Sequence, residues 1–210
     1  IVMWHEPRQV PSWLIFDVSQ MKLRPCSFGV GLALDETKAL PRNFADERAL
    51  PERTSSLALG VTGPIRKFRT DFLFEYAIFP SAIMRFDAEW ERAGRKMALG
   101  DVILQRAVMP PVGFGLCLEF AVRVSALFDD ERRVGFAYET LSDHAESGVS
   151  EFYFEERGGE ILFTIHTFSQ PGHWTSRFAS RLVTLPYQAW CTQRALHHVR
   201  RRFHRENQTG

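Results

Sequence analysis

The chain has 210 residues and a formal net charge of +1, with 45% hydrophobic and 24% charged residues. This length suits one domain with an appended segment, and the composition excludes a globally disordered chain. A charge this balanced also argues against a protein built mainly to bind nucleic acid. The unusual feature is the content of 18 phenylalanines, which predicts either a large aromatic core or a cavity with aromatic walls.

Cys26, Cys117 and Cys191 lie far apart and form no CxxC spacing. This odd, scattered set argues against a disulfide framework or a zinc ribbon, and it favours a reducing, cytoplasmic location. No apolar run approaches the roughly 20 residues of a membrane-spanning helix, and the first residues show no secretory signal. We therefore expect a cytoplasmic protein without a transmembrane segment, and we identify no metal or cofactor site.

Residues 1–56 contain five prolines and only short apolar pieces, so neither a strand nor a helix period persists. We expect an irregular N-terminal extension at 1–56, followed by one α+β domain at 57–205.

The domain opens with the apolar run Leu57–Val61, and a helix is predicted next, from residue 64 to about residue 78. Thr62 suits its N-cap and Pro64 its first position. The apolar positions of this helix recur at spacings of three and four: Ile65, Phe68, Phe72 and Tyr76.

Beyond this helix, short apolar segments alternate with turn residues and predict strands. In the longest, Leu116 to Phe128, an apolar residue occupies every second position, which predicts one buried and one wet face. Gly158-Gly159 indicates a hairpin. The short connections imply an antiparallel meander, because parallel neighbours need long crossovers. The predicted strands lie near residues 82–86, 102–108, 116–128, 134–138, 152–154 and 161–165.

A long amphipathic helix is predicted from about residue 172 to 204, with a kink or break caused by Pro186. Only the antiparallel sheet offers a surface large enough to cover its apolar stripe. The predicted fold is therefore α+β, with a curved antiparallel sheet packed on a long C-terminal helix, as in helix-grip, START-like domains that transfer lipids or cyclise polyketides.

The run GFAYETLSDHAESG at 135–148 and the strand that ends in Ser169 and Pro171 resemble the uncharacterised family known as domain of unknown function 1990. This resemblance implies a helix-grip-like fold more than an activity, because the function of the family is itself unsettled. The positions that carry the resemblance are Gly135, Phe136, Tyr138, Thr140, Leu141, His144, Glu146, Gly148, Phe152, Phe168, Ser169 and Pro171.

The sequence departs from the family pattern at three of its positions. Glu139 stands where the family tends to have glycine, and Val149 and Ser150 stand where it has two acids. The resemblance therefore gives no support here to a role for those acids, although Glu146 and Glu151 lie close enough in sequence to replace them.

The first functional hypothesis is a binding module that holds a small apolar or amphipathic molecule between the sheet and the last helix. Its aromatic wall would include Phe152, and its polar contacts would be Arg106, Tyr138 and His166. Arg106 shares a face with Leu104 and Val108, which predicts an inward-pointing charge able to meet a carboxylate.

The second hypothesis is an enzyme that uses acid–base chemistry on a small hydrophobic substrate. Tyr138, Thr140, His144 and Glu146 cluster around one loop and include the groups such chemistry needs. Alternatively, these residues form a turn that is held by side-chain hydrogen bonds and has no catalytic role. The third hypothesis is a structural or interaction domain without a ligand.

Two features of the C-terminal region complete the candidate set. Trp174 lies on the apolar stripe of the last helix, and Ser169 is placed to cap its start rather than to act as a nucleophile. The arginines between residues 194 and 205 could contact phosphate or an acidic membrane, or could form a solvated basic helix end.

Overall fold

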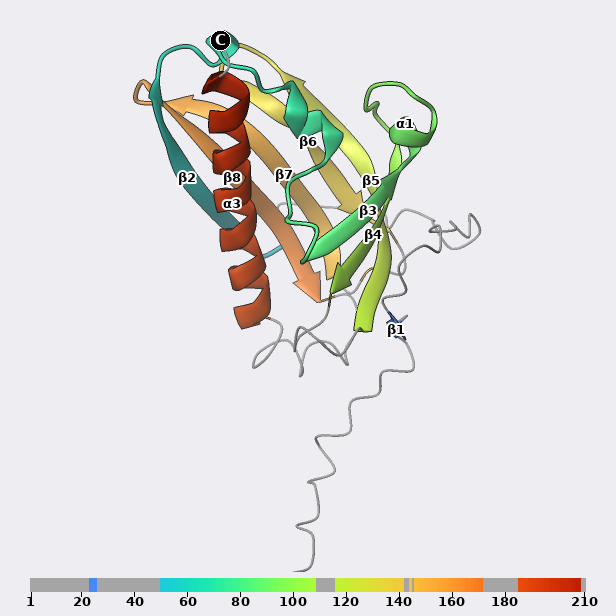
Figure 1. Ribbon diagram of the computed structural model, residues 1–210. Coiled ribbons are helices and arrows are strands. Elements are labelled where there is room, and N and C mark those ends of the chain that lie inside the picture. The colour runs from blue at the N-terminus through green and yellow to red at the C-terminus, as the bar shows by residue number, and fades with distance from the viewer. Residues whose placement is uncertain are drawn as a thin grey trace, which may run out of the picture.

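The computed structural model describes residues 23–25, 50–108, 116–141, 144, 146–171 and 185–208. An antiparallel sheet curves around a long C-terminal helix (Figure 1), which confirms the predicted α+β helix-grip class. The elements are β1 (Leu23–Pro25), β2 (Glu52–Thr62), η5 (Ile65–Lys67), η6 (Asp71–Glu75), β3 (Met84–Ala88), α1 (Glu89–Arg92), β4 (Val102–Val108), β5 (Leu116–Asp129), β6 (Arg133–Thr140), β7 (Glu146–Arg157), β8 (Glu160–Pro171) and α3 (Leu185–Gln208).

The strands pair in the order β2-β8-β7-β6-β5-β4-β3, and β1 pairs with the beginning of β5. Strands β3 to β8 are neighbours in chain order and are all antiparallel, which confirms the predicted meander. Strand β2 pairs with β8 from Glu52 onward, so it begins well before the apolar run Leu57–Val61. Strand β1 and the first five residues of β2 thus lie within the range 1–56 that is predicted to be irregular.

A β-bulge interrupts β5 and corrects the prediction of one continuous apolar row. The register moves between Val124, which pairs with Tyr138, and Ala126, which pairs with Ala137. Because an extra residue reverses the alternation of side chains, Phe128 lies on the face opposite to Val124. The two faces are called concave, on the side of α3 and Val124, and outer, on the side of Phe128.

The predicted helix at 64–78 is not formed; two short 3₁₀ turns, η5 and η6, take its place. Phe68 is extended, with φ −108° and ψ 149°, and its ring packs on Phe203 of α3 with centroids 5.4 Å apart. Tyr76 ends η6 with a left-handed φ of 61°. The apolar spacing correctly predicts buried positions, because Ile65, Phe72 and Tyr76 are all buried. Packing against the rest of the protein nevertheless favours two short 3₁₀ turns over one continuous helix.

Helix α3 lies over β2 and β8 (Figure 1), with Leu196, Val199 and Phe203 buried against the sheet. The first half of the predicted helix, with Trp174, lies outside the described residues. Pro186 occupies the first turn of α3, where the backbone N–H has no helical partner to lose, so the described helix has no proline kink at this position.

Cys117 is disulfide-bonded, whereas Cys191 on α3 is a free thiol. The cysteine count argued against such a bond, since sequence spacing says little about which distant strands become neighbours. The partner of Cys117 lies outside the described residues.

Candidate ligand-binding face

The concave face carries a cluster of aromatic rings between the sheet, the η5–η6 segment and α3. Phe136 and Phe152 stack with centroids 5.5 Å apart, and Phe154 contacts Phe163 at 5.3 Å and Phe203 of α3 at 5.5 Å. All five rings are buried, so this half of the sheet–helix space is filled by side chains. These five of the 18 phenylalanines therefore form part of the core.

A polar network lies inside this aromatic cluster. Gln105 of β4 is 1% exposed, and its Nε2 donates a hydrogen bond to the hydroxyl of Tyr76. Burial raises the pKa of Tyr76 well above its ordinary value, and the charge and hydrogen bond of Tyr138 raise it further. The other amide atom, Gln105 Oε1, is buried without a hydrogen-bond partner in the described part of the chain.

The concave face becomes polar at the level of Tyr138. Cross-strand pairing aligns Tyr138 with Ser150, then Thr167, then Arg53 at the edge strand β2. Residues paired across a sheet share a face, so these four side chains form a concave polar row. Within it the hydroxyls of Ser150 and Thr167 lie 3.4 Å apart, and both residues are half-buried.

Half-buried aromatic rings flank this polar row. Phe79 meets the edge of Phe152 at 6.4 Å between centroids, and Phe120 meets His144 at 4.3 Å. Neither Phe79 nor Phe120 is fully buried, in contrast to the rings of the aromatic cluster. This half of the concave face thus combines hydroxyls with partly exposed apolar surface, which is the combination that small-molecule sites use.

Two residues of the predicted reactive set, Tyr138 and His144, have different surroundings. Tyr138 joins the buried network with Tyr76, whereas His144 packs on Phe120 and its backbone N–H donates to Leu141 at 3.0 Å. Glu146 opens β7, and its side chain lies outside the described part.

Thr140 and Ser169 both belong to strands. The buried Thr140 hydroxyl accepts a 3.0 Å hydrogen bond from Gly148 N–H, which makes it a link between β6 and β7. Ser169 of β8 pairs with Gly148 of β7, and its backbone N–H donates to the carbonyl oxygen of Pro51 at 3.1 Å. The expectation that Ser169 caps a helix is therefore wrong, because β8 continues to Pro171.

Arg106 points away from the proposed cavity, contrary to the prediction. Gln105, which alternates with it, faces the core, so Arg106 lies on the outer face with its cross-strand neighbour Glu119. Its Nε donates to Glu119 at 2.8 Å, and both side chains are largely buried. The charge is neutralised within the sheet instead of being offered to a ligand.

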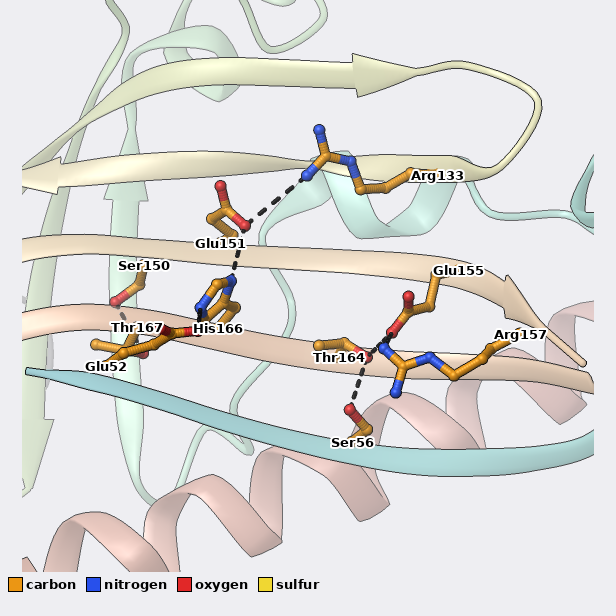
Figure 2. Close-up of polar contacts among 10 residues, drawn as sticks. All are labelled: Glu52, Ser56, Arg133, Ser150, Glu151, Glu155, Arg157, Thr164, His166 and Thr167. Carbon is orange, nitrogen blue, oxygen red and sulfur yellow. Dashed lines mark hydrogen bonds and ion pairs between the residues drawn. The ribbon is translucent and has the colours of Figure 1, made fainter. Parts of the chain in front are cut away.

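His166 is also on the outer face, because it alternates with the core residue Ile165. Its Nε2 lies 2.8 Å from Glu52 and its Nδ1 lies 3.3 Å from Glu151, so it connects β2, β8 and β7 (Figure 2). Glu151 also pairs with Arg133 at 3.8 Å. His166 therefore ties three strands together on the face opposite to Tyr138.

A second outer-face cluster follows the same pattern. The Thr164 hydroxyl donates to Glu155 at 2.7 Å and lies 2.9 Å from the hydroxyl of Ser56, while Arg157 donates to Glu155 at 2.9 Å (Figure 2). Both clusters are structural links between strands. The residues that sequence reasoning missed on the concave face are Tyr76, Gln105, Ser150 and Thr167.

A surface depression of about 510 Å³ lies at the β5–β6 turn, away from the polar row. Four of its five lining residues are charged, two of each sign: Arg66, Arg132, Glu131 and Glu156, together with Pro64. This composition does not suit an apolar ligand.

Among the described residues, no group of three or more histidine, cysteine, aspartate or glutamate side chains is arranged to hold a metal ion. In the same part of the chain, no helix combines the length and apolarity required to cross a membrane.

Three comparisons place the chain among known proteins. A UPF0548 protein of Deinococcus radiodurans is 39% identical over 71 residues, which cover 33% of this chain and 36% of that protein, so the match spans about a third of the relative. The major latex-like protein 151 of Panax ginseng has a TM-score of 0.46 at 15% identity, over 71% of this chain and 97% of that one. Norcoclaurine synthase of Thalictrum flavum has a TM-score of 0.39 at 10% identity, over 80% of this chain and 96% of that one.

The model of the family called domain of unknown function DUF1990 matches residues 40–204. This range contains β2 to β8 and most of α3, and so it includes the whole concave face described above. The chain belongs to the DUF1990 family.

Proposed function

We propose that this protein binds a small apolar or amphipathic molecule between the concave face and α3, at the level of the polar row. The proposal is supported mainly by a change in burial along the concave face. The aromatic rings are fully buried at one end, whereas Phe79 and Phe120 are half-buried at the other, beside the hydroxyls of Ser150 and Thr167. An amphipathic ligand would lay its apolar part against these rings and direct its polar group to the hydroxyls.

The aromatic cluster around Phe154 limits where the ligand sits. Since that end is filled, the ligand would occupy the half near the beginning of α3 and the end of β8. Tyr138 and His144 then remain in the proposed site and are joined by Ser150 and Thr167, whereas the buried Phe152 belongs to the filled aromatic cluster. Arg106 and His166 are not included, because each is engaged by carboxylates on the outer face.

Native mass spectrometry of the purified protein tests the proposal first, since a co-purified ligand would add a defined mass that organic denaturation removes. A fluorescent amphipathic probe such as anilinonaphthalene sulfonate then gives an affinity that competing fatty acids and aromatic acids should displace. A protein that carries no ligand and binds neither probe nor competitor would contradict the proposal.

The variant Ser150→Ala/Thr167→Val tests the polar row directly. Each lost hydrogen bond costs about 1 kcal/mol net, so the loss of two should weaken the affinity for an amphipathic competitor roughly 30-fold and change that for an apolar one little. Thr54→Val is the matched control, because Thr54 is exposed on the outer face of β2 beside His166. Equal effects of the two substitutions would remove the polar row from the site.

Acid–base chemistry at the same face remains the second candidate, since Tyr138 and His144 both belong to the proposed site. Incubation of any identified ligand with the protein, followed by mass analysis, would reveal turnover. Loss of turnover in His144→Gln with unchanged ligand affinity would favour an enzyme, whereas an unchanged ligand mass would favour binding alone.

A further inference from the structure

The solvent side of α3 carries a continuous basic stripe, defined here as Trp190, Arg194, His197, Arg201 and Arg205. Their spacings of three and four residues place them along one line of the helix. All five are exposed, while Leu196, Val199 and Phe203 on the other side are buried. The stripe runs from residue 190 to residue 205, which is about 22 Å along this helix of 24 residues.

In the described part of the chain, no acidic residue forms an ion pair with Arg194 or Arg201 of this stripe. Glu206 is the one acid within α3, and it lies 3.8 Å from Arg202, which also pairs with Glu75. Arg202 has a side chain only 15% exposed, so these acids balance a charge at the packed side of the helix. The cations of the stripe face water.

Neighbouring residues extend the positive surface at the C-terminal end of α3. The N–H of Arg69 donates to Asn207 at 2.8 Å, which places the exposed Arg69 and Lys67 beside this end. The pKa of His198 is lowered by burial and by the charges of Arg201, Arg202 and Arg205. The latter contribution reflects a local excess of positive charge.

Charge is also segregated across the whole chain. Helix α3 contains five arginines and one glutamate, whereas the chain has a net charge of only +1, so the other residues together are net negative. A protein with this distribution presents one helix to anionic partners and repels them elsewhere.

The exposed Trp190 favours a membrane surface over nucleic acid as the anionic partner. Its indole is 42% exposed, stacks on Tyr187 with centroids 5.8 Å apart, and lies 5.4 Å from the Arg194 guanidinium. Tyr187 in turn donates to the carbonyl of Val108, so the indole is held at the surface. Tryptophan prefers the membrane–water interface, whereas nucleic-acid surfaces use aromatic rings interleaved with the basic residues.

We propose that the basic stripe of α3 docks this protein on an anionic membrane surface. The arginines would lie against headgroup phosphates, and Trp190 would rest at the level of the headgroups at one end of the helix. The apolar side of α3 stays packed on β2 and β8, so the helix lies flat on the membrane without inserting. This inference goes beyond ligand binding and does not depend on it.

Co-sedimentation of the full chain with vesicles tests the proposal. We expect binding to vesicles of equal parts phosphatidylcholine and phosphatidylglycerol, no binding to phosphatidylcholine alone, and a loss of binding as salt shortens the screening length. Absence of binding to the anionic vesicles at low salt would overturn the proposal.

The variant Arg194→Gln/Arg201→Gln/Arg205→Gln removes the three exposed arginines of the stripe, and glutamine retains the helix propensity. One arginine near an anionic leaflet contributes about a fivefold change in affinity, so the triple variant should bind roughly 100-fold more weakly. Lys96→Gln/Arg132→Gln/Arg157→Gln is the matched control, because it removes the same charge from exposed positions outside α3. An equal loss in this control would overturn the assignment to α3.

Trp190→Ala separates a membrane from other polyanions. We expect about fivefold weaker vesicle binding and loss of the blue shift in tryptophan emission that accompanies it. Binding of a short RNA or DNA duplex that depends on the same arginines, without vesicle binding, would assign the stripe to nucleic acid and overturn the proposal. Self-association through α3, seen by light scattering without vesicle binding, would overturn it as well.

Discussion

Gly135 offers the sharpest test of how β6 and β7 pack. A Cβ at this position would lie 2.1 Å from the carbonyl oxygen of Phe152 and 2.6 Å from the Cα of Tyr153, both backbone atoms. Real Cβ contacts are essentially never below 3.0 Å, so the two strands would have to separate by about 1 Å from their usual spacing of about 4.8 Å.

Such a separation would break two or three ladder hydrogen bonds, each worth about 1 kcal/mol, in addition to overpacking the core. We expect Gly135→Ala to lower the free energy of unfolding by about 3 kcal/mol, and the Tm by about 6–12 °C. Urea unfolding followed by circular dichroism measures the first quantity and calorimetry the second.

Gly158→Asn is the control for this experiment. Gly158 has a φ of +63°, which asparagine tolerates, and nothing lies within 4 Å of a Cβ placed there. The control adds a larger side chain than alanine, yet it should change stability by only about 0.5 kcal/mol. A Gly135→Ala protein as stable as the control would refute the reasoning from strand spacing.

Two further predictions concern buried polar groups. Tyr76→Phe removes the acceptor of the Gln105 amide and should cost about 1–3 kcal/mol, whereas Tyr76→Phe/Gln105→Met should cost less than the sum of its single substitutions by about 1 kcal/mol. Strict additivity in urea unfolding of the four proteins would contradict this coupling. Asp101 accepts two hydrogen bonds from Arg95, at 2.7 and 2.6 Å, and this interaction is the main cause of its lowered pKa. A carboxyl whose pKa falls on folding stabilises the protein above its unfolded pKa of about 3.9 and loses that contribution as the pH falls through the folded value. Asp101→Asn should therefore be less stable than the original chain near neutral pH, and the difference should shrink in acid; a gap independent of pH would rule out the linkage.

The sequence alone determined the antiparallel meander from β3 to β8, but not the edge position of β2 beside β8. Alternating apolar residues, the Gly158-Gly159 turn and short connections specified an antiparallel meander, because each of these signals acts over only a few residues. The apolar stripe of the last helix required a covering surface, and the sheet supplied it. The same local information identified Tyr138 and Phe152 as concave-face residues.

Only the tertiary structure decided which face each charged residue occupies. The sequence shows that Gln105 and Arg106 point in opposite directions, but not which of them meets the core. The sequence likewise predicts His166 in a cavity, although its ring nitrogens contact Glu52 and Glu151 on the outer face. The partners that settle such choices lie on other strands, far away in sequence.

The predicted helix at 64–78 failed for a related reason. Its apolar spacing was real, yet Phe68 gains more by packing on Phe203 of α3 than by continuing a helix. The bulge after Val124 likewise moved Phe128 to the outer face, since one extra residue reverses the alternation of a strand. The spacing of apolar residues in the sequence predicts whether a segment suits a helix or a strand. The contacts between helices and strands decide where that spacing is interrupted.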